Sequence, residues 1–465
     1  MKRFLWKAIP TVLFAMAVAI QLFGPNQIGK SDNGDFPKVL GRLGVWVAPE
    51  FRPDLFSFFV TDYRIDEAHT WSPGIPGTEV WVAAVAKGVC KLLLPSGYFD
   101  IRVLGAVHGI LTTLAFWLCL IPLENWPWPR RLFFTAVFLL VFADPQYVQF
   151  FSAAYMDTAS MVFLILVFAV AWNAALQEQA ASYGWAVCFG LCGALFLGTK
   201  LQHEACAIPL AVFCFAIAWR AGHRANRIAW LLTPLAFIAT AGFMASHTYT
   251  GYRVEPFFSA VFFKVLPASS NPEATLRELN RPATDAAFNH MFAYSAGSPL
   301  TNPAYRASFE HDLTAATILN FYLRHPETAL QILRSDFLAF SADVPISSFG
   351  TMRRVDNPIP LFRASGPQPW SAFRRYLATL WPWHIPLLFV IVPALSRYFR
   401  NTIWPLAVAI SGIGILSFLA GSLLDATETS RHIIIYQEAT DLLYVVTFFL
   451  LLNLRLQLAE RRILK

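Results

Sequence analysis

The sequence predicts an all-α polytopic membrane protein with about ten transmembrane helices. Of its 465 residues, 56% are hydrophobic and only 14% are charged. An average soluble domain carries about 25% charged residues, so this chain has too few polar side chains to cover a surface that faces water. The same composition excludes an intrinsically disordered chain, a fibrous repeat and an ordinary cytosolic enzyme.

The second observation behind this fold class is the series of long apolar stretches, because a membrane-spanning helix needs about 20 apolar residues. The stretches that approach this length are 8–23, 99–122, 132–150, 156–176, 183–199, 204–219, 228–246, 376–396, 402–423 and 440–456. The first of them also fits a signal peptide, but Gln21–Pro25 offers no small-residue cleavage site. We therefore expect an uncleaved anchor.

The third observation is the distribution of the basic residues, which give the chain a net charge of +7. If the N-terminus is cytoplasmic, Lys and Arg concentrate in the cytoplasmic segments, as the positive-inside rule requires. These residues are Lys2, Arg3, Lys7, Arg130, Arg131, Arg220, Arg224, Arg227, Arg397, Arg400, Arg455, Arg461, Arg462 and Lys465. Only the short 177–182 turn lacks the excess. The basic charge thus indicates an N-in/C-in orientation, and we expect no nucleic-acid partner.

The predicted topology divides the chain into three parts. Residues 1–246 form an N-terminal transmembrane module with seven spans and a catalytic first outer loop over 26–98. Residues 247–375 form an exoplasmic loop or cap, and residues 376–465 form a C-terminal transmembrane module with three spans. Both long loops then face the exoplasmic side of the membrane.

An additional helix is expected within the first outer loop. The stretch Glu79–Leu94 is apolar but contains Lys87 and Lys91, and counting it as a span would invert the charge pattern downstream. We therefore expect an amphipathic helix that lies in the outer membrane interface, with both lysines reaching toward water.

Candidate functional residues are the ionisable side chains near hydrocarbon depth, because such residues are energetically expensive in a membrane. The first cluster is Asp32 and Asp35, which follow the first span with Asn33 and Gly34 between them. One of these carboxylates can act as the base that removes a proton from an attacking hydroxyl. Both can instead bind a divalent cation through their oxygens, or form only a turn at a helix end.

The next two clusters also have a structural alternative. Tyr63, His69 and Trp71, later in the same loop, provide the mixture of groups that binds sugars or phosphates, but they also fit an ordinary solvated loop. Asp157 begins a span whose next dozen residues are apolar. It fits a helix N-cap, a functional acid, or both at once.

The fourth cluster consists of residues at the outer ends of later spans. Lys200 precedes one span, and Glu428, Arg431 and His432 precede the last one. Cations beside the outer membrane surface suit an anionic phosphate, but they violate the positive-inside tendency, so some other group must compensate them. The structural alternative is an ion pair between Glu428 and Arg431.

These features together resemble the GT-C superfamily of integral-membrane glycosyltransferases, which take sugars from polyprenyl-phosphate donors. The resemblance includes an acidic first outer loop, a membrane-plane helix, Tyr155-Met156-Asp157, Thr199-Lys200 and a large outer loop before the last spans. More narrowly, Asn33-Gly34-Asp35-Phe36 and Glu428-x-x-Arg431-His432 resemble bacterial hexose transferases of surface-glycan biosynthesis. Tyr322–Glu327 is similar to a segment often seen before the last spans of such enzymes.

The resemblance implies a multi-pass protein of the bacterial inner membrane whose active site faces the periplasm. It implies a polyprenyl-phosphate sugar donor, a glycan or lipid-linked acceptor, and an acid of the first outer loop as catalytic base. This sequence lacks the Asp-Glu pair common at that point, so we favour Asp35 as the base, with Asp32 second. Lys200, Arg431 and His432 would then balance the charge of the leaving phosphate.

No cofactor is required by the inverting displacement that this implies, because phosphate is already a good leaving group. A divalent cation held by Asp32, Asp35 and Asp157 is the alternative. Two other classes of function fit some of the same features. A transporter or flippase of lipid-linked sugars should show internal repeats and interrupted helices, and a non-catalytic partner in envelope assembly would need no base. The polar residues cluster at one face of the membrane, which favours chemistry at that surface.

Overall fold

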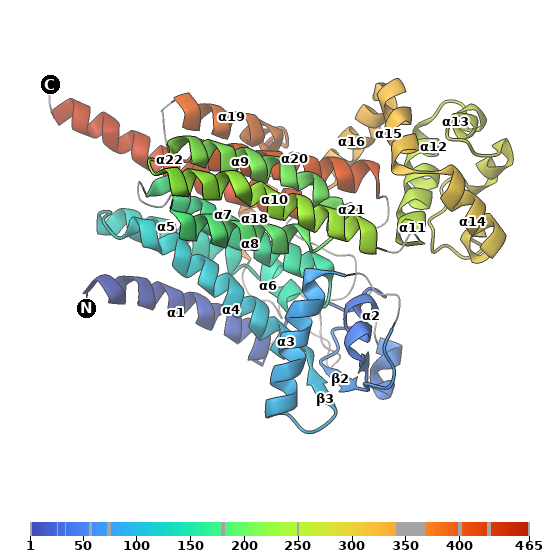
Figure 1. Ribbon diagram of the computed structural model, residues 1–465, viewed down its shortest axis with the longest axis horizontal. Helices are drawn as coiled ribbons and strands as arrows, with labels where there is room; N and C mark the ends of the chain where they lie inside the picture. Colours follow the sequence, from blue (N-terminus) through green and yellow to red (C-terminus); the bar gives the residue numbers. More distant parts are fainter. Residues whose placement is uncertain are drawn as a thin grey trace.

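The computed structural model describes residues 2–25, 27–32, 34–54, 58–71, 76–177, 182–248, 251–340, 368–398, 402–425 and 429–463. Figure 1 shows an elongated helical bundle with both chain termini at one end. The segments that follow α1 and α10, which correspond to the two long outer loops, gather at the opposite end (Figure 1). This arrangement agrees with termini that share one side of the membrane.

Seven helical spans in the described residues are long and apolar enough to cross a membrane. They contain α1 (Lys2–Phe23), α4 (Ile101–Leu120), α7 (Met156–Leu176), α9 (Ala207–Arg220), α10 (Arg224–His247), α20 (Trp404–Leu423) and α22 (Ile434–Ile463). A further helix, α8 (Tyr183–Leu197), is apolar but shorter. The prediction of an all-α polytopic membrane protein is confirmed, and each predicted span falls on a helix or on a bent pair of helices.

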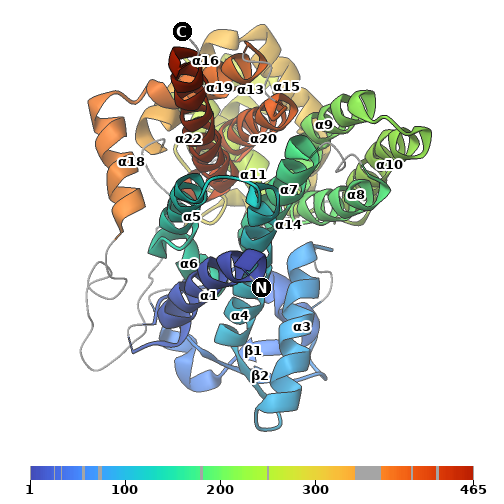
Figure 2. The same ribbon diagram turned by 90° about the vertical axis from the view of Figure 1, so that its left-hand side faces the viewer.

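Helix α7 is the centre of the bundle, since every residue from Met156 to Ala175 is buried. In the view down the bundle, α4, α8, α20 and α22 surround it (Figure 2). A helix that is apolar on all sides can be enclosed in this way without leaving a polar face unsatisfied. The outer end of α7 therefore lies deep within the protein.

Two predicted spans are bent pairs instead of single helices. The range 132–150 holds α5 (Trp128–Phe142) and α6 (Pro145–Phe151), which meet at 60°, and the range 376–396 holds α18 (Pro369–Leu380) and α19 (His384–Tyr398), which meet at 101°. At the first bend Asp144 accepts a hydrogen bond from the Gln146 backbone N–H at 3.0 Å and thus caps α6. Proline interrupts the helical hydrogen bonds at both bends, because Pro145 and Pro382 have no N–H to donate. Each of these two predicted spans therefore corresponds to a pair of helices that passes as a span only when the pair is taken together.

The first outer loop contains a small sheet that the sequence did not predict. Its antiparallel strands β1 (Val45–Val47), β2 (Asp62–Ile65) and β3 (Tyr98–Asp100) lie in the order β1-β2-β3. The loop also holds α2 (Phe36–Val39), η1 (Gly41–Leu43) and η2 (Pro49–Asp54). Gly44 has a φ of 63°, and a Cβ there would lie 2.4 Å from the Asp66 carbonyl oxygen, so the turn into β1 requires glycine.

The amphipathic helix of this loop is α3 (Thr78–Leu93). It runs across the direction of the bundle helices in both Figure 1 and Figure 2, as expected of a helix parallel to the membrane plane. The prediction that both lysines reach toward water holds for Lys91, which is exposed, and is wrong for Lys87, which is largely buried. Lys87 and Lys91 donate to Glu67 Oε1 at 2.9 and 2.6 Å, so they tie α3 to the remainder of the loop.

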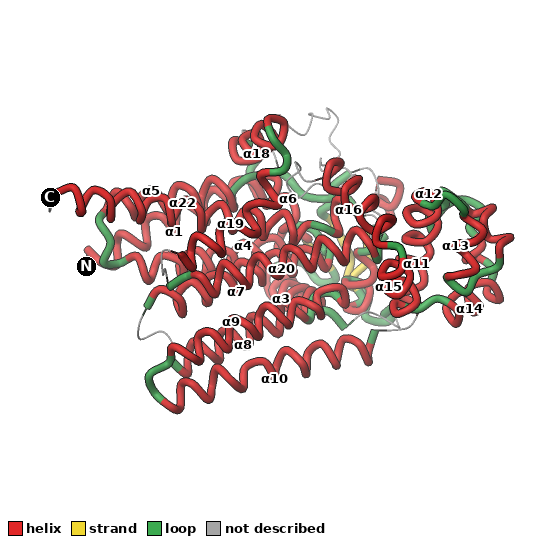
Figure 3. Tube along the Cα trace, turned by 90° about the horizontal axis from the view of Figure 1, so that it is seen from above, coloured by secondary structure: helices red, strands yellow, loops and turns green. Residues whose placement is uncertain are grey.

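The second outer loop folds into a cap of short helices. These are α11 (Gly251–Ser259), η6 (Ala260–Val265), α12 (Leu266–Ala268), α13 (Pro272–Glu278), η7 (Ala283–Phe288), η8 (Pro299–Thr301), α14 (Pro303–Asp312), α15 (Ala315–Arg324) and α16 (Pro326–Phe340). They enclose an apolar cluster of their own, which includes Phe258, Phe262 and Phe309. Lys264 Nζ, which contacts Asp336 Oδ2 at 2.5 Å and the Ser422 carbonyl at 3.0 Å, joins this cap to the end of α20. Figure 3 shows the cap beyond the end of the bundle.

Candidate active site

Asp157 lies at the centre of a buried charge cluster at the outer end of α7. Its side chain is fully buried and receives Lys200 Nζ on Oδ1 at 2.5 Å and Arg431 Nη1 on Oδ2 at 3.1 Å. The N-cap position of α7 is Tyr155, and the carboxylate of Asp157 makes these two ion pairs instead of a cap. A buried carboxylate is tolerable because both of its oxygens face a cation.

Asp35 belongs to the same cluster, although it comes from the first outer loop. Lys38 Nζ lies 2.5 Å from its Oδ1, and Arg431 Nη2 lies 2.7 Å from its Oδ2. Burial alone would raise the pKa of the Asp35 carboxyl, but Arg431 and Lys38 outweigh burial and hold this pKa well below its usual range. Asp35 is therefore an anion in this arrangement.

Arg431 connects the parts of the cluster, since one guanidinium bridges Asp35 and Asp157. It comes from α21 (Thr429–His432) and lies 4.8 Å above the ring of Tyr155. The Tyr155 hydroxyl donates to the Ser31 carbonyl at 2.7 Å, which connects the start of α7 to the first outer loop. A planar group with several N–H donors suits this double contact, which a lysine could not reproduce.

His432 extends the cluster toward the end of α20. Its Nδ1 pairs with the Asp425 carboxylate, and its Nε2 lies 3.2 Å from Arg431 Nη2. Lys200, Asp157, Asp35, Arg431 and His432, which the sequence singled out in three separate clusters, are thus brought together by the fold.

Asp32 lies beside this cluster and also shapes the local turn. Its Oδ1 accepts hydrogen bonds from the backbone N–H groups of Gly34 at 2.7 Å and Phe36 at 3.1 Å. Burial raises the pKa of Asp32 to about 6, and these two hydrogen bonds oppose that rise. The turn interpretation is therefore correct for Asp32 without excluding a chemical role.

The remaining predicted site residues of the first loop lie elsewhere. Tyr63 is buried on β2, where its ring meets Phe99 edge-on at 6.2 Å. His69 is exposed and its Nδ1 contacts Asp66 Oδ2 at 2.7 Å, and Trp71 is partly exposed near Gly41. Within the described ranges, no hydrogen bond or ion pair joins these three side chains to the charge cluster, so their sugar-binding roles stay predictions.

Two further expectations concern Glu428 and a metal. Glu428 lies outside the described residues, so the proposed Glu428–Arg431 pair stays a prediction; Arg431 has Asp35 and Asp157 as partners. Among the residues that the structure describes, no group of three or more His, Cys, Asp or Glu side chains is arranged to hold a metal ion. The oxygens of Asp35 and Asp157 contact cationic side chains instead.

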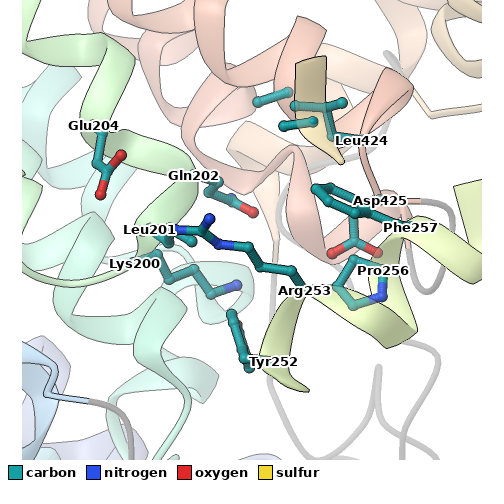
Figure 4. A pocket seen from close by; sticks show the side chains of 12 residues that line it. Lys200, Leu201, Gln202, Glu204, Tyr252, Arg253, Pro256, Phe257, Leu424 and Asp425 are labelled. Atoms are coloured by element: carbon teal, nitrogen blue, oxygen red, sulfur yellow. The ribbon is translucent and has the colours of Figure 1, made fainter. Parts of the chain in front are cut away.

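A pocket of about 290 Å³ opens beside the cluster (Figure 4). Lys200 and Asp425 line it together with Gln202 and Glu204 of η5 (Leu201–Cys206). The opposite side is formed by α11 of the cap, and Leu201, Phe257 and Leu424 add apolar surface. Such a pocket offers both cations and an apolar wall to one ligand.

Several residues of this site were missed at the level of sequence. Lys38 could have been found, because it lies three residues after Asp35 and the two share a turn of helix. Tyr252 and Arg253 of α11, both of which line the pocket, had no local signal, since only the packing of the cap brings them to Lys200.

A second buried polar cluster on α22 was also missed. Arg374 Nη1 of α18 lies 3.1 Å from Asp441 Oδ2, and the Tyr147 hydroxyl donates to the same carboxylate. These contacts link α6, α18 and α22 inside the bundle. An ionisable residue at this depth is energetically tolerated only when it has a partner of opposite charge, as Asp441 has in Arg374.

Fold and site together define a polytopic helical membrane protein with a buried acid–cation cluster beside a pocket at one end of its bundle. The chain belongs to the family of the YfdI N-terminal transmembrane domain, whose model matches residues 2–402. The family is thus one of transmembrane domains, in agreement with the helical spans, and the wider resemblance to the GT-C superfamily stays a prediction. The narrower resemblance to hexose transferases of surface-glycan biosynthesis stays a prediction.

No curated protein matches this chain. Among solved structures, the chain is similar to the archaeal oligosaccharyltransferase AglB from Archaeoglobus fulgidus in complex with an inhibitory peptide and a dolichol-phosphate, at 10% identity and a TM-score of 0.39. The match covers 98% of this chain and 52% of that chain, so this chain spans about half the length of that enzyme.

Proposed function

We propose that this protein is a membrane glycosyltransferase that moves a hexose from a polyprenyl-phosphate donor to a glycan or lipid-linked acceptor. The observation that carries the proposal is the guanidinium of Arg431, which bridges Asp35 and Asp157 beside a pocket lined by Lys200. The resemblance of the sequence to the GT-C superfamily supports the same class of reaction, and membership of the YfdI transmembrane-domain family agrees with a reaction at the membrane. The reaction takes place at the exoplasmic face of a bacterial inner membrane, the side that the distribution of Lys and Arg assigns to the long loops.

The donor enters with its phosphate toward Lys200 and Arg431. The phosphate competes with Asp35 for the guanidinium of Arg431, because one guanidinium cannot serve both anions at full strength. Release of Arg431 raises the pKa of Asp35 from its depressed value and turns an ion-paired carboxylate into a usable base. Asp35 therefore becomes able to accept a proton when the donor is bound.

Transfer is a single inverting displacement. An acceptor hydroxyl loses its proton to Asp35 as its oxygen forms a bond to the anomeric carbon. The bond between that carbon and the phosphate oxygen breaks, and polyprenyl phosphate leaves with both bonding electrons. Lys200 and Arg431 balance the charge that develops on this leaving oxygen, while His432, held by Asp425, keeps Arg431 in position.

The proposal is tested with purified protein in liposomes, supplied with radiolabelled polyprenyl-phosphate hexoses and a membrane glycan extract. We expect transfer of label to the extract. Labelled lipid that becomes accessible on the far leaflet without transfer would instead identify a flippase. A protein that neither transfers nor moves the lipid would contradict the proposed reaction.

Asp32 predicts a distinct pH dependence. Because burial raises its pKa to about 6, Asp32 takes up a proton as the pH falls through that value and weakens its hold on the Gly34 and Phe36 N–H groups. We expect kcat/KM for transfer to fall by about tenfold per pH unit below this pKa, since this quantity reports groups of the free enzyme. The Asp32→Asn variant, whose neutral side chain mimics protonated Asp32, should transfer at the low rate that the wild type approaches at acidic pH and should lack this acidic limb. Loss of all transfer in Asp32→Asn, with Asp35→Asn still active, would make Asp32 the base.

We further propose that no metal takes part in the reaction. Asp35 and Asp157 are each neutralised by two cationic side chains, which leaves them little attraction for a divalent ion. EDTA should therefore leave the rate of transfer unchanged. A loss of transfer that Mg²⁺ or Mn²⁺ restores would show that a cation displaces Lys38 or Lys200 from these carboxylates.

A further inference from the structure

A second concave surface lies on the other side of the membrane bundle from α3 and α4. It is a groove of about 550 Å³ between the cap helix α16 and the membrane helices α19, α20 and α22. Figure 2 shows these four helices together on one side of the molecule. Hereafter we call this surface the α16–α20 groove.

The groove is almost wholly apolar. Its floor is formed by Tyr436, whose ring stacks on Phe389 at 5.2 Å and packs on Phe418 at 4.8 Å. One wall is formed by Phe337 of α16, stacked on Trp383 at 5.0 Å. This surface suits a hydrocarbon chain. Aromatic side chains such as those that line it are typical of the boundary between membrane and water.

One charged side chain, Arg334, stands among the described residues that line the groove. It is exposed on α16, and within the described part of the chain it makes no ion pair or hydrogen bond. The neighbouring acid Asp336 is engaged by Lys264 at 2.5 Å. The α16–α20 groove, which is apolar and carries Arg334 on the cap helix α16, is therefore complementary to a lipid chain that ends in an anionic phosphate.

The groove and the pocket at Lys200 lie on different sides of the same helix. Ala420 of α20 and Leu424, which follows this helix, line the pocket, whereas Ile415, Phe418 and Leu419 of α20 line the groove. The floor residue Tyr436 follows Arg431 by five positions along the chain, and α16 packs against α21, which carries Arg431. A lipid in the groove therefore lies next to the helices that carry Arg431, on the side of α20 away from the pocket.

We propose that the α16–α20 groove binds the lipid chain of the acceptor, with its phosphate at Arg334, so that the acceptor is a lipid-linked glycan. This inference rests on the proposed function, because a transferase needs two substrates at one cluster. The donor occupies the pocket at Lys200, and the acceptor reaches Asp35 from the groove. One helix, α20, separates the two lipids.

The first test detects binding without activity. Protein in vesicles is illuminated with a diazirine-bearing polyprenyl phosphate, and the labelled peptides are identified. We expect label on α19 and α20 residues of the groove, removed by unlabelled polyprenyl phosphate and reduced by Ile415→Trp and Arg334→Glu. The matched controls are Val212→Trp, at an exposed apolar position on α9, and Arg277→Glu, at an exposed position on α13. Equal competition by phosphatidylglycerol would reduce the groove to a site for any bilayer lipid and overturn the inference.

The second test separates acceptor from donor. Arg334→Glu and Ile415→Trp should raise KM for a lipid-linked acceptor by about tenfold, the size expected for loss of one charge-assisted contact, and leave KM for the donor unchanged. A rise in the donor KM alone would assign the groove to the donor and overturn the inference. Absence of transfer by the wild-type protein would contradict the proposed function instead, and the labelling experiment would still decide what the groove binds.

Discussion

Replacement of Asp35 by Asn should reduce transfer by about 10²- to 10⁴-fold, the range expected for loss of a general base. The amide keeps the size of the side chain but cannot accept the proton of the acceptor hydroxyl. It also leaves Lys38 and Arg431 without one of their anions. The measurement is the rate of sugar transfer in liposomes at saturating donor and acceptor.

The matched control for this variant is Glu273→Gln on α13, where an exposed carboxylate contacts Arg277 at 3.3 Å, far along the chain from the cluster. It should transfer at the wild-type rate. A thermal melt distinguishes misfolding from lost chemistry, and Asp35→Glu, which keeps the charge, should melt like the wild type. Wild-type transfer by a folded Asp35→Asn protein would remove Asp35 from the mechanism.

Replacement of Arg431 by Gln should lower kcat by about 10²- to 10³-fold, as does removal of one preorganised donor to a developing anion in other enzymes. Arg431 is the group that bridges the carboxylates of two distant segments, so its loss also weakens the alignment of Asp35 with Asp157. We expect KM for the donor to rise at the same time, because the phosphate loses a partner before and during the reaction.

Arg431→Lys distinguishes charge from geometry. A lysine restores the positive charge but cannot contact both carboxylates with a planar fork, so it should recover only part of the lost rate. Arg277→Gln on α13 is the neutral control. Full recovery with lysine would show that charge alone matters, and an unchanged rate in Arg431→Gln would exclude a role in stabilising the leaving phosphate.

Much of the fold could be predicted from local features of the sequence. The apolar stretch 156–176 became α7 without change, and Glu79–Leu94 became α3 within one residue at each end. Hydrophobic length and backbone hydrogen bonding are decided within each segment, because a helix satisfies its own N–H and C=O groups. The bends at Pro145 and Pro382 could also have been predicted from local features, because proline removes a helical hydrogen bond.

The composition of the site could be predicted only in part. Asp35, Asp157, Lys200 and Arg431 were recognisable because each is a charge placed where a membrane protein rarely tolerates one. Their pairing was not, since Arg431 and Asp157 are separated by 274 residues. The expected pair of Glu428 with Arg431 stays a prediction, because Glu428 lies outside the described residues, and the partners of Arg431 from two other segments, Asp35 and Asp157, had no local signal.

The sequence by itself therefore determined the class of protein, the position of its helices and the set of charges available at its outer end. These properties follow from hydrocarbon thickness and from the cost of exposing polar groups to lipid, which act on each segment separately. The tertiary structure alone decided that Arg431 bridges Asp35 and Asp157, that Tyr252 and Arg253 reach the pocket of Lys200, and that α20 separates this pocket from the α16–α20 groove. Ion pairs and cavities depend on which helices pack together, and no single segment contains that information.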